Sequence, residues 1–562
     1  MNPTQDPENH DSSSGRVEDG PPSDSVSPVI NNNSELSEKR SQPTSTGEPT
    51  SELPELSQSS ADQDARSSPP YSIHSAWAKR WIVLAASLSA FFSPLTAQIY
   101  LPALTVLAED FSVSNAKINL TVTTYMIFQG ITPMFIGGFA DSAGRRPAYT
   151  ICFVIYIAAN IGLALSNSYA SLLIVRCLQS AGSAATVALC QAVLADIVTS
   201  AERGQYIGFT VLPVVLAPSL GPVIGGLLSQ FLGWRWIFWF LAIVAAVHLF
   251  LVLLFFPETC RRIVGDGSIR PHPIYRTFWS LIKCRNRSTS LTRTASQQTS
   301  ASAKRPPVFS LRPLLVSIQL LTTHLELFLL LFCSGLIFAG FYGLSTALPS
   351  QFHTLYPDLT DVEIGLLYLP LAGGSIASAV FCGPALGYNY KRHARKLGLG
   401  NIEKTKQIDL TETKFPIEKA RLEVGIPLLV LSTAVMLTWG WAIEYSGGLA
   451  VPCVLMFLYG VGMIGFQNTA NALTVDIVPG NAGAAVAAGN LTRCLLGAGA
   501  SAIIVPMIEK MGSGWAYTVF AGLYVAVSPL VWLIMRNGVR WRAEWEKKEA
   551  EKMDRRKVEA WQ

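Results

Sequence analysis

The stretch GGFADSAGRRP, residues 137–147, lies between two long apolar runs, 117–139 and 147–166. Glycines in such a turn let two helices approach closely, and Asp141 can form ion pairs with the arginines that follow it. A bilayer core of about 30 Å is crossed by about 20 helical residues, and both runs reach that length. The stretch therefore predicts two membrane-spanning helices joined by a tight, charged turn at a membrane surface.

Apolar runs of this length recur on both sides of the turn. Half of the 562 residues are hydrophobic and 14% are charged, whereas a soluble chain carries about a quarter charged residues. We predict an all-α membrane protein with twelve transmembrane helices in two six-helix halves, 78–256 and 324–536. The expected spans are 81–105, 117–139, 147–166, 170–195, 205–230 and 234–256, then 325–349, 362–386, 424–444, 449–474, 483–507 and 513–536.

The loops between these spans alternate in charge. Lysine and arginine gather in the central loop 257–323, in the loop 387–423 and in the tail 537–562, while the intervening loops nearly lack them. By the positive-inside rule both termini are cytoplasmic, which requires an even number of spans. Residues 1–77 are rich in Ser, Pro, Asp, Glu, Asn and Gln, so we expect a disordered cytoplasmic tail. We expect the first apolar run to act as an uncleaved signal anchor.

Several classes of function are disfavoured by composition. A net charge of +5 is too small to indicate a nucleic-acid partner. The nine cysteines are scattered without a CxxC pair or a Cys/His cluster, so no metal site is predicted. No nucleophile–base spacing, P-loop or dinucleotide fingerprint is present. We therefore expect neither an enzyme nor a cofactor, and we expect a monomer in the lipid bilayer.

Three elements carry a resemblance to a known family. The turn at 137–147 resembles the signature G-x-x-x-D-[RK]-x-G-R-[RK] of the major facilitator superfamily, with Ser142 where the family usually has a base. RCLQSAG at 176–182 resembles its R-x-x-Q-x-x-G element. APSLGPVIGG at 217–226 resembles the antiporter signature G-x-x-x-G-P-x-x-G-G, with Ala217 at the position of the first glycine. Together they are similar to the fungal twelve-span drug:proton antiporter branch, with its quinidine-resistance-type transporters and related citrate exporters. The resemblance covers about residues 78–540 and implies alternating access.

The resemblance implies a cytoplasmic gate and an antiporter-type helix. In the gate, ion pairs would hold the cytoplasmic side shut and break when it opens; an ordinary positive-inside loop is the alternative. The gate residues are Gly137, Asp141, Gly144, Arg145, Arg146, Asp196, Glu202 and Arg203. The antiporter-type residues are Gly221, Pro222, Gly225 and Gly226, in a span that small residues let pack closely and prolines let bend.

Charged residues within the spans are few and mainly positive. Arg493 lies about nine residues into its span, some 13 Å deep, where snorkelling is difficult. Arg176 is implied by the family to act in proton coupling or substrate binding, although it could also snorkel to the outer headgroups. Glu326, near the inner end of its span, is the remaining candidate for coupling.

Polar residues accompany these charges. They are Gln179, Asn490, Gln467, Asn468, Asn471, Gln98, Tyr125 and Gln129. We interpret the set as a polar, net-positive central cavity for an anionic or polar neutral substrate, although each residue could instead join helices by hydrogen bonds. The sequon at Asn119 lies at a predicted outer end, where glycosylation could reach it.

These observations predict a secondary active transporter. We expect a proton-coupled exporter of a small organic acid, natural product or drug-like compound at the plasma membrane, with proton coupling implied by the resemblance. The alternatives are a facilitative, citrate-like organic-anion exporter, a vacuolar location and a membrane sensor that does not transport.

Overall fold

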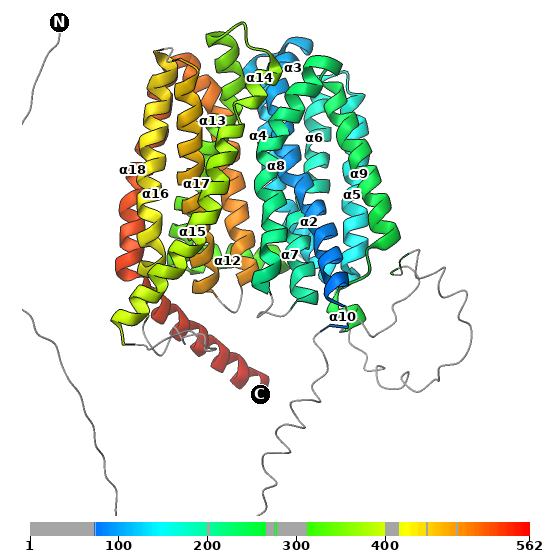
Figure 1. Cartoon of the computed structure of the whole chain (residues 1–562). Coiled ribbons are helices and arrows are strands. Elements are labelled where there is room, and N and C mark those ends of the chain that lie inside the picture. Colours follow the sequence, from blue (N-terminus) through cyan, green and yellow to red (C-terminus); the bar gives the residue numbers. More distant parts are fainter. Residues whose placement is uncertain are drawn as a thin grey trace, which may run out of the picture. The chain divides into compact units, whose positions relative to one another are not determined.

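The computed structural model describes residues 72–73, 75–198, 203–265, 275, 277, 312–398, 415–445, 448–478 and 482–561. All of them belong to one compact unit, Pro69–Gln562. Most of the tail 1–77 and all of Glu202 lie outside the described residues. Where the structure describes regular secondary structure, it is helical throughout (Figure 1).

The first half is built from one helix after another. Its elements are α2 (Ala76–Ile99), η1 (Leu101–Ala103), α3 (Leu104–Asp110), α4 (Asn115–Ala143), α5 (Arg145–Ala164), α6 (Tyr169–Ser183), α7 (Thr186–Ile197), α8 (Arg203–Leu232) and α9 (Arg235–Phe255). Serines begin several of them: Ser75, Ser114 and Ser168 each accept a backbone N–H in the first turn of the helix that follows. Gly144 and Gly233 separate α4 from α5 and α8 from α9, and both have positive φ, which glycine adopts without strain.

The second half repeats this construction after a connecting segment. The elements are α10 (Arg261–Val264), α12 (Arg312–Thr323), α13 (Leu325–Leu355), α14 (Asp361–Leu366), α15 (Leu369–Lys396), α16 (Ile417–Glu444), α17 (Ala450–Ile477) and α18 (Ala482–Trp561). α18 contains two helices, because Gly512 has φ 81° and ψ 165° and interrupts the helical backbone. Glu444 accepts hydrogen bonds from the amides of Ser513 (2.7 Å) and Gly514 (3.2 Å), which stabilises the bend.

The prediction of twelve membrane-spanning helices is confirmed. Ten helical segments are long and apolar enough to cross a membrane, and the last of them, Ala482–Trp545, includes the break at Gly512 and so supplies two spans. α4 completes the set: it has 29 residues, and Asn115, Lys117 and Asn119 at its start lower its apolarity.

The helices extend beyond several predicted spans. α15 runs to Lys396 and α16 begins at Ile417, so most described residues of the predicted loop 387–423 are helical. The basic residues His393, Arg395 and Lys396 in the last turn of α15 favour that extension, since cations stabilise a helix C-terminus. The tail 537–562 likewise continues α18 as a helix to Trp561.

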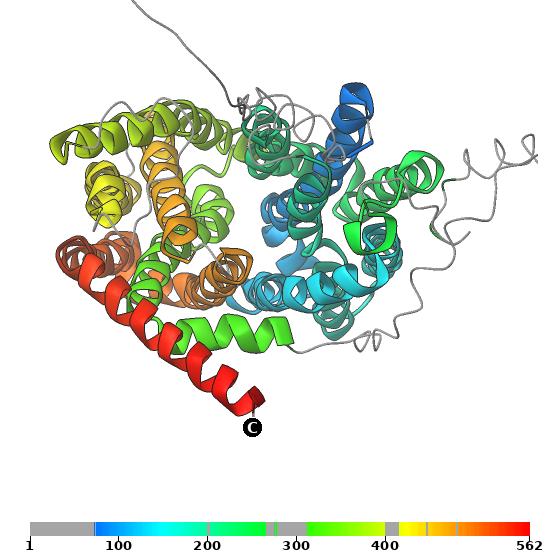
Figure 2. The ribbon, with the colours of Figure 1, turned by 90° about the horizontal axis from the view of Figure 1, so that it is seen from below.

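The helix bundle has two ends, the upper face and the lower face of Figure 1. The lower face carries α10, α12 and the start of α2; the upper face carries α3 and α14. α4 packs against α18 and α8 packs against α14, so the halves meet along both pairs. Figure 2 shows α12 and the end of α18 running across the lower face.

Candidate functional site

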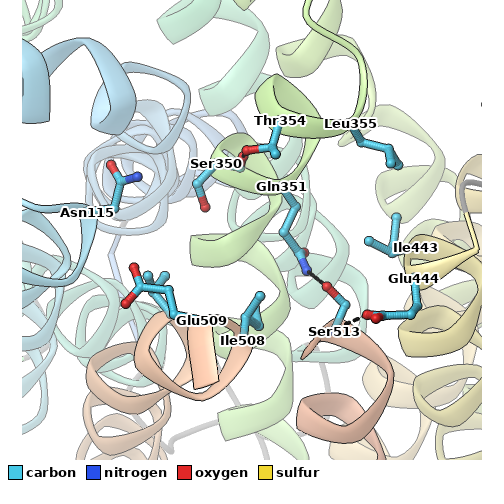
Figure 3. Close-up of a pocket in the computed structure, with 11 residues that line it drawn as sticks. Asn115, Ser350, Gln351, Thr354, Leu355, Ile443, Glu444, Ile508, Glu509 and Ser513 are labelled. Atoms are coloured by element: carbon cyan, nitrogen blue, oxygen red, sulfur yellow. Dashed lines mark hydrogen bonds between the residues drawn. The ribbon is translucent and has the colours of Figure 1, made fainter. Parts of the chain in front are cut away.

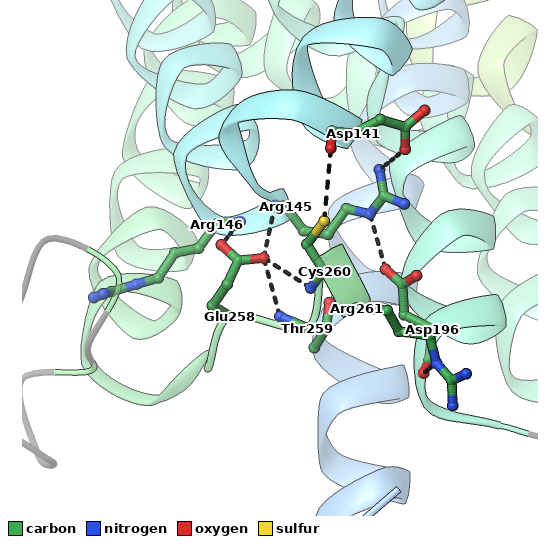
Figure 4. A network of polar contacts seen from close by, with 8 residues as sticks. All are labelled: Asp141, Arg145, Arg146, Asp196, Glu258, Thr259, Cys260 and Arg261. Carbon is green, nitrogen blue, oxygen red and sulfur yellow. Dashed lines mark hydrogen bonds and ion pairs between the residues drawn. The ribbon is translucent and has the colours of Figure 1, made fainter. Parts of the chain in front are cut away.

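The predicted gate forms a charged network at the lower face (Figure 4). Arg145 begins α5 and is 7% exposed. Its Nη1 lies 2.5 Å from Asp141 Oδ1, and its Nε lies 2.9 Å from Asp196 Oδ2. One guanidinium therefore joins the end of α4 to the end of α7, as the ion pairing predicted for the turn requires.

Glu258 is the residue of this network that the sequence analysis missed. Its Oε1 accepts from the backbone amide of Arg145 (2.8 Å) and its Oε2 accepts from that of Arg146 (3.1 Å). Oε1 also accepts from the amides of Thr259 (3.1 Å) and Cys260 (2.9 Å). The carboxylate thus caps the N-terminus of α5, where its charge complements the helix dipole. An acidic residue directly after span six, facing a helix that begins at glycine without a side-chain cap, was the available signal.

Gly144 explains how that carboxylate comes so close. A Cβ at this position would lie 2.6 Å from Glu258 Oε2, and φ at Gly144 is +106°. Close approach was also expected at Gly137, but a Cβ there would meet nothing within 4 Å, so that expectation is wrong for Gly137.

Arg146 of the predicted gate makes a different contact, and so do the neighbouring Arg261 and Cys260. Arg146 donates from Nη2 to the carbonyl of Leu253 (2.7 Å), and Arg261 donates from Nε to the carbonyl of Asp196 (2.9 Å). Arg203 begins α8, but its side chain and the whole of Glu202 lie outside the described residues. Cys260 packs against Asp141, and burial raises the pKa of its thiol. All these partners belong to the first half or to the segment that directly follows it.

The second half has carboxylates of its own at the lower face. Its equivalent turn, at 383–387, has no acidic residue. In the structure Glu423 of α16 accepts from His393 Nε2 at 2.8 Å and from Asn389 at 3.2 Å. Asp476, at the end of α17, accepts from Arg421 Nε at 2.9 Å.

Arg176 lies deep inside the first half and is 0% exposed, so it does not snorkel to a headgroup. Its guanidinium lies over the rings of Tyr100 (4.1 Å) and Tyr125 (4.6 Å). It donates to Gln179 through Nη1, and Gln179 in turn donates to Asn160 (2.7 Å). Its Nε and Nη2 have no hydrogen-bond partner among the described residues. Two aromatic faces and one amide thus surround this cation, and no carboxylate of the described residues pairs with it.

Arg493 is the corresponding cation of the second half. It lies in α18, partly exposed, with its guanidinium 5.5 Å from the ring of Phe338. No described side chain or backbone group forms a hydrogen bond or ion pair with it. Tyr342 is within electrostatic reach of Arg493, Cys494 and Tyr125, and Tyr125 contacts Arg176. Tyr125 of α4 and Tyr342 of α13 therefore lie near one another, Tyr125 against Arg176 and Tyr342 in the neighbourhood of Arg493.

Among the predicted polar residues, Tyr125, Gln129 and Asn490 form one hydrogen-bonded group, and Gln467 forms a separate contact. Tyr125 donates to the carbonyl of Ser93 (3.2 Å) and Gln129 donates to its hydroxyl (3.3 Å). Asn490 of the second half donates to the carbonyl of Gln129 (3.2 Å), which joins the halves. Gln467 accepts from Ser334 (2.5 Å).

The other predicted polar residues, Gln98, Asn468 and Asn471, do not join either of these contacts among the described residues. Gln98 is buried and its Oε1 has no partner among the described residues. Asn468 is half-buried, Asn471 is exposed, and neither forms a side-chain hydrogen bond with a described residue. Asn119 is 3% exposed inside α4, so the folded protein does not offer its amide for glycosylation, contrary to our expectation.

Glu326 lies apart from both arginines. It is in the first turn of α13 at the lower face, about 18 Å along the helix from Phe338, which contacts Arg493. Its neighbours are Glu418 and Arg542.

The antiporter-type glycines serve two interfaces. A Cβ at Gly221 would lie 2.9 Å from the backbone nitrogen of Ile99, and one at Gly225 would overlap the Ile99 carbonyl, so both pack α8 against α2. A Cβ at Gly226 would overlap the carbonyl of Asp361, at the start of α14.

Gly365 of α14 makes the matching close contact from the second half. A Cβ there would lie 2.5 Å from the carbonyl of Pro222. Gln230 of α8 also accepts from the amide of Val362 (3.2 Å), next to the crossing. Gly373 and Gly374 of α15 instead pack against Phe457 of α17. We name Gly226, Gly365 and the backbone they contact the glycine crossing; it holds the halves together at the upper face.

A pocket of about 340 Å³ also opens at the upper face (Figure 3). Asn115 lines it from the first half, and Glu444 and Glu509 are among the residues that line it from the second. Gln351 donates to Ser513 (2.9 Å) at its wall. No predicted site residue lines this pocket, and its carboxylates are unsuited to an anion.

Comparison with known proteins shows what the chain resembles. A family model described as Major Facilitator Superfamily matches residues 86–502. "MFS-type transporter phiD" of Fungal sp. (strain ATCC 74256) is 46% identical over 480 residues, covering 85% of this chain and 71% of that protein. "MFS-type transporter tstD" of Talaromyces stipitatus is 38% identical and covers 90% of each chain. "Citrate exporter 1" of Aspergillus niger is 32% identical, covering 87% of this chain and 91% of that protein.

Solved structures show the same fold. A crystal structure of a D-xylose–proton symporter matches with a TM-score of 0.55 at 16% identity, covering 80% of this chain and 96% of that one. A bacterial homologue of the human lysosomal transporter Spinster, described as inward-facing and unoccupied, matches with a TM-score of 0.54 at 14% identity, covering 84% and 99%. At these identities the likeness concerns the fold alone.

Proposed function

The chain belongs to the major facilitator superfamily, and we propose that this multi-pass membrane transporter is an exporter of a small organic acid or an acidic natural product. Its relatives and its fold are those of transporters, not of enzymes. The substrate class, the direction and the coupling are our proposal.

Arg493 carries the proposal about the substrate. A guanidinium in a membrane span is costly unless a counter-charge or water accompanies it, and this one has no hydrogen-bond or ion-pair partner among the described residues. Arg176 adds a second cation that is met only by tyrosine rings and an amide. A carboxylate substrate would supply the missing counter-charge, since guanidinium groups bind carboxylates strongly in a dry environment.

The relative named Citrate exporter 1 supports an anionic substrate. Citrate is a polycarboxylate, and two arginines that no described carboxylate neutralises match such a molecule in charge. The same relative also supports the second candidate, facilitated export of an organic anion without protons.

Alternating access would use the contacts at both faces. The glycine crossing joins the halves at the upper face, while the charged network of Arg145 lies within the first half at the lower face. We propose that the lower face is cytoplasmic, as the basic loops favour, and that the crossing separates when the upper face opens. We place the transporter in the plasma membrane as a monomer, with the vacuolar membrane as the alternative.

Reconstitution into proteoliposomes tests substrate and coupling together. Vesicles preloaded with citrate, or with a panel of mono- and polycarboxylates, should release acid faster than empty-lipid controls. If protons are coupled, an imposed pH gradient should change the rate when valinomycin and potassium hold the membrane potential at zero. A rate that follows the membrane potential alone would favour the facilitative exporter.

Arg493→Gln tests the binding role of the guanidinium. We expect transport to fall about tenfold or more, because a hydrogen bond to a charged group is lost in the membrane interior. Arg536→Gln is the matched control: it removes the same charge from the second helix of α18, at an exposed position beside Trp532. Unchanged transport by the Arg493 variant would reject the proposal.

A further inference from the structure

Two carboxyl groups and one guanidinium are buried together at the lower face. Glu326 of α13 and Glu418 of α16 are both 0% exposed, and Arg542 of α18 is 3% exposed. Arg542 donates from Nη1 to Glu418 Oε1 at 2.7 Å and from Nη2 to the carbonyl of Phe415 at 2.9 Å. Both oxygens of Glu326 and Oε2 of Glu418 have no hydrogen-bond partner among the described residues.

The end of α18 closes this cluster. We name its last part, Gly538–Trp561, the tail helix. A Cβ at Gly538 would lie 2.9 Å from Glu326 Oε1 and 3.0 Å from the carboxyl carbon of Glu418. Both carboxyl groups therefore lie against the same point of the tail helix, and glycine, though unfavourable within a helix, lets that helix come so close. Two turns later Trp545 lies against His324, with ring centroids 4.8 Å apart.

The charges of the cluster do not balance. If all three groups were ionised, two negative charges would face one positive charge where no group is more than 3% exposed. An unpaired buried charge is far costlier than a protonated carboxyl group. One added proton removes the excess charge and also creates an O–H donor between two carboxyl groups whose oxygens lack partners.

The neighbouring groups do not supply the missing positive charge. Burial lowers the pKa of His324 to about 4, so that ring is neutral near pH 7. Asp476 lies within electrostatic reach of Glu418 but is already paired with Arg421. Arg542 is shared between Glu418 and the Phe415 carbonyl.

We propose that Glu326 and Glu418 form a proton-binding site that the tail helix closes, so that docking of this helix takes up one proton. The proton comes from water at the lower face and forms an O–H bond on Glu326, which donates to Glu418. When the tail helix leaves, both carboxyl groups meet water and the proton returns to it. Docking is therefore favoured at low pH and weakens as pH rises, because the docked state binds the additional proton. The proposal depends on neither the substrate nor the direction of transport.

Hydrogen–deuterium exchange of the full-length protein in lipid nanodiscs tests this site. The amides of residues 538–550 are followed from pH 5.5 to 8.5, corrected for the intrinsic pH dependence of exchange. In the wild-type protein we expect protection to fall by about tenfold per pH unit over the range in which the single proton is released. Protection that stays constant across this range would overturn the proposal.

Two variants balance the charge in different ways. Glu326→Gln leaves Glu418 paired with Arg542, and Glu418→Gln leaves Glu326 as the counter-ion of Arg542. In both, protection should stay high and lose its dependence on pH. If both variants kept the wild-type pH dependence, or if both lost protection at every pH, the site would be structural and the proposal wrong.

Two more variants complete the experiment. Arg542→Gln removes the positive charge of the cluster, so the docked state then has to bind two protons. Protection should fall off at lower pH than in the wild-type protein and more steeply with pH, whereas an unchanged profile would contradict the role given to that arginine. Glu544→Gln removes an exposed carboxylate from the same helix and should keep the wild-type profile. A changed profile in that variant would attribute the pH dependence to the helix surface instead.

Discussion

Arg421 donates from Nε to Asp476 Oδ2 over 2.9 Å, and Arg145 donates from the same nitrogen to Asp196 over the same distance. Arg145 and Arg421 are near the starts of α5 and α16, and Asp196 and Asp476 are near the ends of α7 and α17. Each half therefore joins its third and fourth spans at the lower face by an equivalent ion pair. The residues around the two arginines differ in type, so the sequence alone does not show this repetition.

The second of these pairs predicts a measurable coupling. In a double-mutant cycle of Arg421→Ala and Asp476→Ala, we expect an interaction free energy of about 1 kcal/mol, since both side chains are about a fifth to a quarter exposed and solvent weakens the attraction. Denaturant unfolding in detergent measures it. Strictly additive single effects would show that the pair contributes no coupling.

Glu258 predicts a loss of stability at the start of α5. Glu258→Gln replaces a carboxylate that accepts from four backbone amides with a single carbonyl acceptor, and should cost about 1–3 kcal/mol of unfolding free energy. Glu109→Gln, an exposed glutamate at the end of α3, is the control and should change stability little. Equal stability of the two variants would contradict the capping role.

The glycine crossing predicts control of the upper face. Gly226→Ala or Gly365→Ala places a methyl group against opposing backbone, so the two halves should fail to close there. We expect faster thiol labelling of a cysteine introduced at Asn115, in the upper-face pocket, and slower transport. Gly383→Ala is matched in chemistry, since a Cβ there meets nothing within 4 Å, and should leave both measurements unchanged. Unaltered labelling in the first two variants would refute the closing role.

Arg176 predicts that geometry matters beyond charge. Lysine keeps the positive charge but lacks the planar guanidinium that stacks between Tyr100 and Tyr125 and donates to Gln179. Arg176→Lys should therefore reduce transport about tenfold or more. Arg235→Lys, at an exposed arginine that lies over Trp234, is the control. Wild-type transport by Arg176→Lys would show that charge alone suffices.

Much of the fold can be predicted from short-range sequence patterns. Runs of about 20 apolar residues mark spans because the bilayer imposes that length. The motif at 137–147 predicted the pairing of Asp141 with Arg145, and the family resemblance added Asp196, which also pairs with Arg145. Helix ends were harder to place, since α15 and α16 continue through polar residues beyond the bilayer length.

Other features depend on tertiary contacts that no local pattern encodes. Glu258 approaches α5 only because the chain returns after six spans, and Gly365 meets α8 only once the two halves pack. Glu326 is a candidate for coupling because it is one of few charged residues in the predicted spans, whereas its neighbours Glu418 and Arg542 come from helices far along the chain. The sequence shows that a charged residue lies in an apolar run, but it does not show which distant residue lies next to that charge in the fold.

The continuity of α18 has a mechanical consequence. After Gly512 no described residue interrupts the helix, so the last span and the 24 residues from Gly538 to Trp561 form one rod. Those residues extend about 35 Å beyond the span, and a tilt of the last span by about 10° would displace the tip by several ångströms. While the tail helix is docked, its end therefore moves further than the last span when the second half tilts. A fluorophore attached at Trp561 would report that tilt from outside the substrate path.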